Sequence, residues 1–297
     1  MGMLTPTLQH YVAGIEQEIT AAMPSTDTLQ KTVSEAMAYA CEAGGKRLRP
    51  LLVLAFAELC GGTAQTAMPY ACAIEMIHCY SLVHDDLPCM DNSLLRRGKS
   101  SVFAKYGEDM ALLAGDGLLT RAFEWGLKPS HVAAAGADRA VEAMAILADA
   151  AGINGMVGGQ TIDLESEGKS IDMDTLCALQ AGKTGALLTA ACEMGAVLGG
   201  ADATAREAAR RYGMELGLCF QIIDDILDVT STAETLGKPV GADEENLKVT
   251  YVSLLGLEEA KRLARYHTDE ALAALSIFDE KASDLTQMTK ALLERSM

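Results

Sequence analysis

TAREAARRYGMELGLCFQIIDDILDVT, residues 204–230, is the stretch that best indicates how this chain folds. Its apolar side chains recur at steps of three and four residues, and carboxylates gather near its end. Such a spacing places side chains on one face of an α-helix, whereas a strand needs strict alternation. The stretch therefore predicts a long amphipathic helix with an acidic end. The apolar stripe consists of Tyr212, Leu216, Cys219, Ile223 and Leu227.

The same spacing recurs through most of the chain. Aromatic residues are only 5% of the composition, and no run shows sustained strand-like alternation. Glycines and prolines separate the periodic segments, among them the pair Gly158-Gly159, but no low-complexity linker divides the chain. We therefore expect one all-α domain over residues 1–297. Further helices are expected near residues 8–22, 30–43, 50–60, 67–86, 109–126, 132–151, 173–198, 256–274 and 281–295.

Charge and cysteine usage narrow the class of protein. The chain carries 24 Lys and Arg against 41 Asp and Glu, a formal net charge of −17, which disfavours nucleic acid and anionic membranes as partners. The most apolar stretch, residues 185–201, holds Glu193 in its middle, so we expect a buried helix and no stable membrane insertion. Eight cysteines without CxxC spacing, and no recognisable targeting segment, predict reduced thiols in a cytoplasmic protein.

Two acidic motifs stand out, HDDLPCMD at residues 84–91 and QIIDDILD at residues 221–228. Each ends an apolar helix, where carboxylates are costly unless they have a partner. Gln221, Asp224 and Asp228 follow one another at helical spacing and should share a face. Clustered carboxylate oxygens suit Mg²⁺, which also takes substrate phosphates as ligands. One such motif alone is more often a solvated helix end, but two in one chain indicate a site for divalent metal and phosphate.

The first motif does not fit a straight helix. Six residues separate Asp85 from Asp91, a rotation of about 240° at the helical repeat. Pro88 lies between them and would disturb a helix. The sequence therefore predicts a kink or bulge that returns Asp91 toward Asp85.

Basic residues are placed as if to hold phosphates. GGKRLRP at residues 44–50 puts three cations behind two glycines, RRGK at 96–99 follows the first acidic motif, and Lys183 interrupts an apolar helix. In an acidic chain these cations suggest diphosphate clamps, because Arg and Lys both bind phosphate well. Arg47 and Lys99 are interpreted as ordinary surface charges.

These motifs together resemble a known family. GGKRLRP, HDDLPCMD, RRG, GGQTIDLESEGK, KTG, FQIIDDILD and LGKPVGAD occur in this order between about residues 40 and 260. The set resembles the trans-prenyltransferases, or isoprenyl diphosphate synthases, and within them most closely the bacterial-type farnesyl diphosphate synthases. The resemblance implies the isoprenoid synthase fold, an all-α bundle around a deep central cavity, usually as a homodimer, with the two acidic motifs facing each other across its mouth.

The resemblance also implies residue roles. A cluster of about three Mg²⁺ ions, with Mn²⁺ as an alternative, would bind Asp85, Asp86, Asp91, Asp224, Asp225 and Asp228. The allylic diphosphate would bind Arg96, Lys183, Lys238 and Lys248. Isopentenyl diphosphate would bind Lys46, Arg49, His78 and Arg97. The reacting centre would be lined by Lys183, Thr184 and Gln221.

Product length is expected to depend on the fifth residue before the first acidic motif. Here it is Tyr80, followed by Ser81. A bulky ring resembles the enzymes that stop at C15, so the expected product is farnesyl diphosphate, with C20 or C10 as alternatives. Helical geometry alone does not support this role, because Tyr80 lies about 140° from Asp85 around a helix. An ordinary core aromatic is the competing interpretation.

The chain departs from the family pattern at a few positions, and other functions are possible for such motifs. After Asp91 this chain has Asn92, Ser93 and Leu94 where the family usually has more acids, and Leu247 and Val249 replace the usual Gly and Ser. A terpene cyclase would carry an Asn/Ser/Glu metal motif in place of the second acidic motif. A regulatory subunit would be marked by loss of that motif, and a metal phosphohydrolase would need a general base beside the metal. Prenyl chain elongation is the function that the motifs favour.

Overall fold

The computed structural model describes residues 5–230 and 249–294, and nearly all of them are helical. The α-helices are α1 (Pro6–Ala22), α2 (Lys31–Glu42), α3 (Leu48–Leu59), α4 (Ala64–Asp85), α5 (Val102–Tyr106), α6 (Glu108–Gly126), α7 (Pro129–Ala135), α8 (Ala137–Ala151), α9 (Met156–Ser166), α10 (Met173–Gln180), α11 (Ala186–Gly199), α12 (Ala203–Thr230), α15 (Tyr251–Leu255), α16 (Leu257–Leu275) and α17 (Ser283–Glu294). A π-helix, η1 (Ala181–Gly185), joins α10 to α11, and a 3₁₀-helix, η2 (Ser276–Ala282), joins α16 to α17. Within these residues, strand structure is confined to a two-residue hairpin, β1 (Leu95–Arg96) with β2 (Lys99–Ser100).

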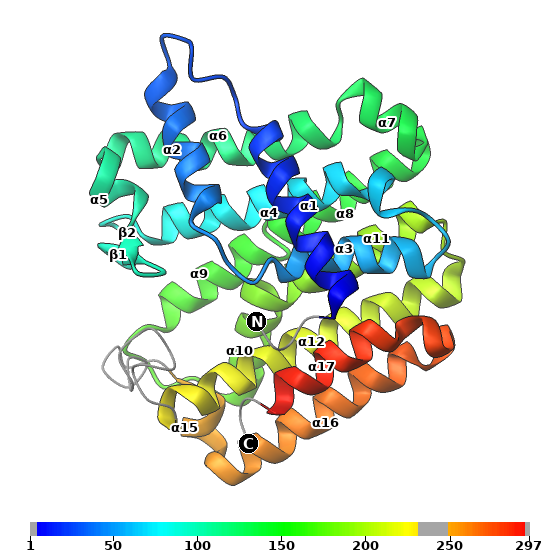
Figure 1. Ribbon diagram of the computed structural model, residues 1–297. Helices are drawn as coiled ribbons and strands as arrows, with labels where there is room; N and C mark the ends of the chain where they lie inside the picture. The colour runs from blue at the N-terminus through cyan, green and yellow to red at the C-terminus, as the bar shows by residue number, and fades with distance from the viewer. Residues whose placement is uncertain (1–4, 231–248, 295–297) are drawn as a thin grey trace.

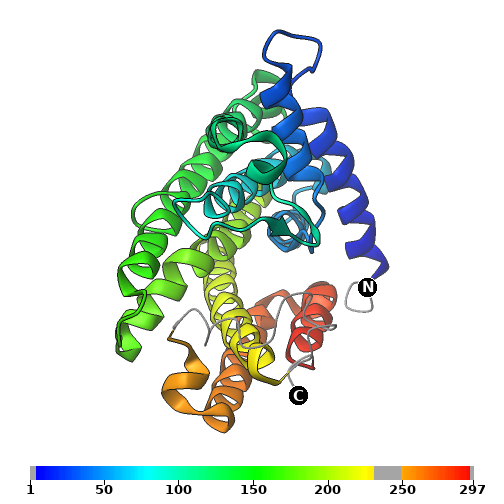
Figure 2. The same ribbon diagram turned by 90° about the vertical axis from the view of Figure 1, so that its left-hand side faces the viewer.

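The core of the bundle is built around α3 and α11. Twelve of the fourteen residues of α11 are buried, and α3 packs along it. Small residues allow this close contact, since a Cβ on Gly195 would lie 2.4 Å from the carbonyl oxygen of Val53. α12 also packs against α11, and α15, α16 and α17 lie against α12 at one end of the molecule (Figures 1 and 2).

Most predicted helices are confirmed within a few residues of their expected bounds, and the fold is all-α as predicted. The segment 132–151 divides into α7 and α8, because Gly136 has a φ of 90° that ends the first helix. The segment 173–198 is interrupted by η1. Helices α5, α9 and α15 were not predicted. Gly158 and Gly159 lie inside α9, so interpreting them as a break was wrong.

The most apolar stretch, residues 185–201, coincides with α11 and is buried, as expected. Its charge, Glu193, is paired with Arg206 at 2.9 Å. Among the described residues, one segment, Ala137–Ser166, is long and apolar enough to cross a membrane by length and composition alone. Core helices of soluble proteins meet the same criterion, and here the segment comprises α8 and α9, which are separated by a turn near Gly152.

Candidate functional site

The first acidic motif turns back on itself, as predicted. α4 ends at Asp85, and the backbone N–H of Asp91 donates a 2.8 Å hydrogen bond to the carbonyl oxygen of Asp85. Asn92 has a φ of 50°, which completes the turn. Asp85 and Asp91 are thereby brought together at the end of the helix. Burial and the nearby Asp91 carboxylate raise the pKa of Asp85, although Lys183 opposes the shift.

Asp86 has a different environment from its neighbour. Its side chain is nearly inaccessible and forms a forked ion pair with Arg96 from β1, the closest contact being 2.5 Å. Burial raises the pKa of Asp86, and the guanidinium of Arg96 counteracts part of this shift. Two residues predicted for different roles, one for metal and one for diphosphate, are therefore paired with each other.

Lys183 lies in the π-helix, where three helices approach closely. A Cβ on Gly159 of α9 would lie 2.0 Å from the backbone nitrogen of Lys183, and one on Gly217 of α12 would lie 2.9 Å from the Cα of Gly185. Glycine is needed here because the backbones touch. The Lys183 ammonium is paired with Asp163 of α9 at 2.5 Å. Asp163 was part of a quoted motif, but its contact with Lys183 was not predicted.

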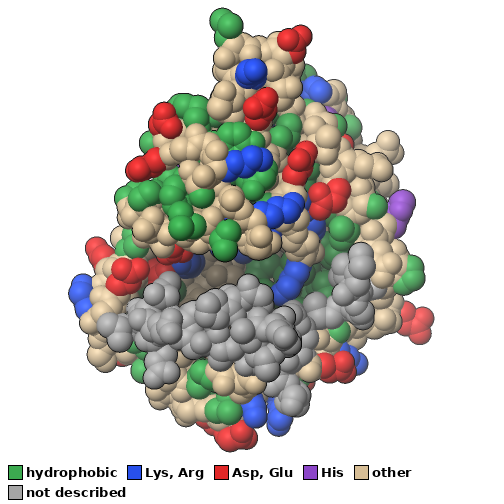
Figure 3. All heavy atoms as spheres, turned by 60° about the vertical axis from the view of Figure 1, so that its left-hand side comes forward, with side chains coloured by type: hydrophobic (Ala, Val, Ile, Leu, Met, Phe, Trp, Pro, Cys, Tyr) green, Lys and Arg blue, Asp and Glu red, His purple; other side chains and the backbone are tan. Residues whose placement is uncertain are grey.

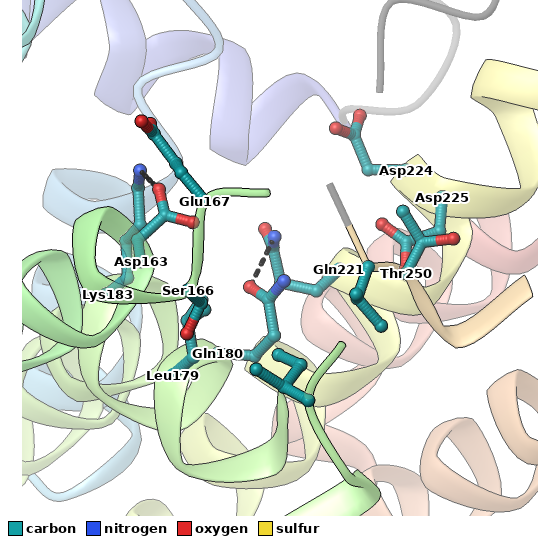
Figure 4. A pocket seen from close by; sticks show the side chains of 12 residues that line it. Asp163, Ser166, Glu167, Leu179, Gln180, Lys183, Gln221, Asp224, Asp225 and Thr250 are labelled. Carbon is teal, nitrogen blue, oxygen red and sulfur yellow. Dashed lines mark hydrogen bonds and ion pairs between the residues drawn. The ribbon is translucent and has the colours of Figure 1, made fainter. Parts of the chain in front are cut away.

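Two cavities meet at Lys183, and its side chain lines both. The first, here called the acidic pocket, is lined by Asp163, Ser166, Glu167, Ile171, Leu179, Gln180, Lys183, Gln221, Asp224, Asp225, Val249 and Thr250. Figure 4 shows Asp163, Glu167 and Lys183 on one side of it and Asp224 and Asp225 on the other. The molecule is visibly hollowed here, with Lys and Arg side chains near the rim (Figure 3).

The second cavity, here called the apolar pocket, has a volume of about 380 Å³. It combines apolar side chains of α4 and α9 with polar groups at its mouth. Its lining includes Arg49, His78, Tyr80, Ser81, Asp85, Met90, Met156, Gln160, Leu164, Lys183 and Thr184. Tyr80, 8% exposed, therefore faces the same cavity as Asp85 despite the angle between them on the helix. This is possible because the pocket surrounds the end of α4 and is lined by several of its faces.

The three aspartates of the second acidic motif differ in their exposure to solvent. Asp224 is exposed, while Asp225 is buried and accepts a 2.8 Å hydrogen bond from the backbone N–H of Tyr251. Asp228 is only 2% exposed and does not line the acidic pocket. It was expected to share a face with Gln221 and Asp224, but only those two residues line this cavity. Gln221 does line it, and donates a 2.8 Å hydrogen bond from Nε2 to Oε1 of Gln180.

Most residues predicted to bind isopentenyl diphosphate lie together. The Arg97 guanidinium packs on Gly45, where a Cβ would lie 2.5 Å from it, so the hairpin contacts the Gly-rich loop. Burial lowers the pKa of Arg49, and the charge of Arg97 adds to this effect. Burial, together with Arg49 and Arg97, also holds the pKa of His78 well below its usual value. A concentration of positive charge around a neutral imidazole suits an anion.

Lys46, the fourth of these residues, contacts a different helix, α12. Its ammonium is 5.0 Å from the centre of the Phe220 ring, next to Gln221 on α12. It therefore links the Gly-rich loop to the helix that bears the second acidic motif.

The interpretation of Arg47 as a surface charge was wrong. Arg47 is 2% exposed and binds Glu16 and Glu75, each at 2.7 Å, and the carbonyl oxygen of Cys41 at 2.6 Å. Its φ of 48° turns its backbone into the left-handed region just before α3. Lys99 is exposed, as expected. Lys238 and Lys248 lie outside the described residues.

The donor set fits a divalent cation that is completed by substrate. Over residues 5–230 and 249–294, no three Asp, Glu, His or Cys side chains form a ready-made metal cage. Mg²⁺ typically takes one or two carboxylates and fills its remaining positions with water and phosphate oxygens. Asp85 and Asp91 on one helix end, and exposed Asp224 on another helix, provide such partial sets.

Residues 30–291 match the family model for polyprenyl synthetase. A geranylgeranyl diphosphate synthase from Cyanophora paradoxa is 45% identical over 280 residues, covering 91% of this chain and 92% of that protein. A farnesyl diphosphate synthase from Geobacillus stearothermophilus is 44% identical over 265 residues, covering 89% and 88%. The apo crystal structure of an FPP/GFPP synthase from Zymomonas mobilis has a TM-score of 0.86 at 37% identity and covers 97% of both chains, which confirms the predicted fold.

Proposed function

Because this chain belongs to the polyprenyl synthetase family, and is therefore a prenyltransferase that elongates trans prenyl diphosphates, we propose that its own product is farnesyl diphosphate. Isopentenyl diphosphate would be joined head to tail to dimethylallyl diphosphate and then to geranyl diphosphate. Each condensation would release diphosphate. The family's reaction is chain elongation, so a cyclase or a phosphohydrolase is no longer a competitive interpretation.

One observation carries the choice of a C15 product. The buried Tyr80 ring lines the apolar pocket that opens beside Asp85. A growing chain anchored by its diphosphate near Asp85 would extend into this pocket and meet the ring. The names of the relatives do not decide the length, since they include both farnesyl and geranylgeranyl synthases, and geranylgeranyl names are the more frequent.

The allylic diphosphate is proposed to bind at the junction of the two pockets. Members of the family generally depend on magnesium, and a divalent cation held by Asp85, Asp91 and Asp224 would neutralise charge on the leaving diphosphate. Lys183 and Arg96 are already side by side with carboxylates, Asp163 and Asp86 respectively. The diphosphate would therefore displace these two carboxylates and bind Lys183 and Arg96 in their place. The fold already holds both cations in position.

Isopentenyl diphosphate is proposed to bind beside Arg49 and Arg97. The neutral imidazole of His78 can donate one hydrogen bond there without adding charge. Once the allylic C–O bond ionises, the isopentenyl double bond attacks the allylic carbon and a proton is lost to the departing diphosphate. The amide of Gln221 and the carbonyl of Thr184 would face the cation as fixed dipoles, which need no reorganisation during the reaction.

The deciding experiment is a product assay on the purified protein. Isopentenyl and dimethylallyl diphosphates are supplied with Mg²⁺, the phosphates are removed, and the alcohols are identified by gas chromatography and mass spectrometry. Farnesol as the main alcohol is the expected result. Geranylgeraniol would retain the reaction but reject the C15 product. No condensation at all would support a regulatory subunit that requires a catalytic partner chain.

We also propose that the chain is a cytoplasmic homodimer. Leu112 and Leu113 on α6 and Val141 on α8 each expose nearly half or more of their surface, which suits a contact between copies. All eight cysteines are free thiols, consistent with a reducing compartment. Light scattering coupled to size-exclusion chromatography would test the dimer, and a monomer at micromolar concentration would refute it.

A further inference from the structure

Gln180 and Gln221 form a side-chain contact across the acidic pocket. Gln180 is the last residue of α10, and Gln221 lies 41 positions later in α12. Nε2 of Gln221 donates to Oε1 of Gln180 at 2.8 Å. Figure 4 shows the two amides reaching toward each other between the Lys183 side and the Asp224 side of the pocket. Nothing in the sequence motifs pointed to Gln180.

In the structure, the nitrogen end of the Gln221 amide faces Gln180. An amide group carries a donor and an acceptor on opposite sides, and rotating it by half a turn exchanges them. With Oε1 of Gln180 as the acceptor, the Gln221 amide must turn its nitrogen toward α10. Its oxygen then points away from Gln180, and Figure 4 shows it within the pocket that Lys183 and Asp224 also line.

We infer that Gln180 is a positioning residue, which holds the Gln221 amide in the orientation that stabilises an allylic cation. The inference rests on the proposed function, in which positive charge develops on the allylic carbon. The amide oxygen is the negative end of the Gln221 dipole, so it stabilises that charge, whereas the NH₂ group would oppose it. A dipole held in its useful orientation before the reaction lowers the barrier more than one that must rotate.

The place of Gln180 in the chain supports this role. It directly precedes the π-helix that carries Lys183 and Thr184, so the residue that orients Gln221 is rigidly linked to the residues expected to hold the diphosphate. Single π-helical turns of this kind often occur at functional sites. The hydrogen bond therefore joins the end of α10, next to the π-helix, to α12.

Two substitutions of Gln180 distinguish the effect of its hydrogen-bond acceptor from the effect of its side-chain size. Gln180→Met keeps the length but removes the acceptor, and Gln180→Glu keeps an acceptor that can only receive a hydrogen bond. The single-turnover rate of condensation with geranyl diphosphate reports on the chemical step. We expect about a tenfold loss for Gln180→Met, with KM for both substrates within about twofold of wild type, and a rate for Gln180→Glu within about threefold of wild type.

A double-mutant cycle distinguishes positioning from a purely structural effect. In a Gln221→Met background, where there is no amide to orient, Gln180→Met should cause no further loss. The melting temperatures of all variants are measured in parallel. If Gln180→Met does not fold, Gln180→Ala removes the same acceptor with less bulk and takes its place in the cycle.

Each outcome bears on a single proposal. Equal single-turnover rates for wild type and Gln180→Met, equal losses for the Met and Glu variants, or independent losses in the double-mutant cycle would overturn the role of Gln180. Failure of the wild-type chain to condense the two diphosphates would instead reject the proposed function. The wild-type assay is therefore done first.

Discussion

The ring of Tyr80 meets the imidazole of His84 edge to face, with centroids 5.8 Å apart. Both residues lie on α4, one turn apart. His84 is in turn held by α6, since its Nε2 is 3.1 Å from the carbonyl oxygen of Leu112 and its ring occupies the space left by Gly115. The proposed floor of the apolar pocket is therefore supported from behind by a second helix.

Removing the Tyr80 ring should lengthen the product. Tyr80→Ala opens the apolar pocket where the chain would otherwise stop, so geranylgeraniol or longer alcohols should become the main products after phosphate removal. Tyr80→Phe keeps the ring and should still give farnesol. A farnesol product from Tyr80→Ala would mean that another residue limits the chain.

The support behind Tyr80 can be tested with two glycines of α6. A Cβ on Gly115 would lie 2.0 Å from Nε2 of His84, whereas one on Gly117 would lie 2.8 Å from the flexible Met37 side chain. Gly115→Ala should displace His84 and with it Tyr80, raising the share of products longer than C15 and destabilising the fold by about 1–3 kcal/mol. Gly117→Ala is the matched control and should leave the product distribution unchanged. Similar product distributions for the two variants would show that the position of His84 does not affect product length.

The buried Arg47 should be critical for stability. Arg47→Met would leave Glu75, which is only 2% exposed, without its cation. Loss of one partner of a buried ion pair typically costs about 3–5 kcal/mol. Urea denaturation should show this loss, while Arg262→Met, which breaks an exposed pair with Glu259, should leave the midpoint unchanged. Equal midpoints for the two variants would contradict the structural role of Arg47.

His78 should make stability depend on pH below its ordinary pKa. Burial and the charges of Arg49 and Arg97 hold its pKa in the folded protein well below the usual 6.5. As the pH falls below about 6.5, His78 therefore binds a proton in the unfolded chain but stays neutral in the folded protein. Stability is complete above this pH and falls as the pH drops through it, by up to about 1.4 kcal/mol per pH unit.

The matched variant for this test is His78→Gln, which cannot titrate. Urea denaturation of both proteins at intervals between pH 7.5 and 5 should show a stability difference that changes in favour of the variant below about pH 6.5. Parallel curves over that range would show that His78 accepts its proton normally in the folded state.

Metal binding should depend strongly on diphosphate. The described carboxylates offer partial sets of ligands, so Mg²⁺ alone should raise the melting temperature only slightly, whereas Mg²⁺ with inorganic diphosphate should raise it by several degrees. Chelation with EDTA should abolish condensation, and added Mg²⁺ should restore it. Asp85→Asn should reduce the joint thermal shift. An equal shift with Mg²⁺ alone would indicate a complete metal site.

The sequence by itself determined the helical class, the approximate helix bounds and the two acidic motifs. The spacing of apolar residues and the local composition depend only on neighbouring residues, so they predict helices without knowledge of the tertiary structure. Even the return of Asp91 toward Asp85 was predictable, because Pro88 and the helical repeat act over only a few neighbouring residues. The family resemblance rested on motifs in a fixed order and is confirmed by the match to polyprenyl synthetase.

Only the tertiary structure decided which side chains meet. The pairing of Lys183 with Asp163, of Gln221 with Gln180 and of Arg47 with Glu75 joins residues 20 to 41 positions apart. A charge in a sequence does not reveal whether it is buried, which is why Arg47 was misinterpreted. A helical wheel gives only the angle between two side chains around the helix axis, whereas the apolar pocket surrounds the end of α4 and includes both Tyr80 and Asp85. Burial and cavity shape arise from helix packing, and packing depends on contacts between distant segments that no local pattern encodes.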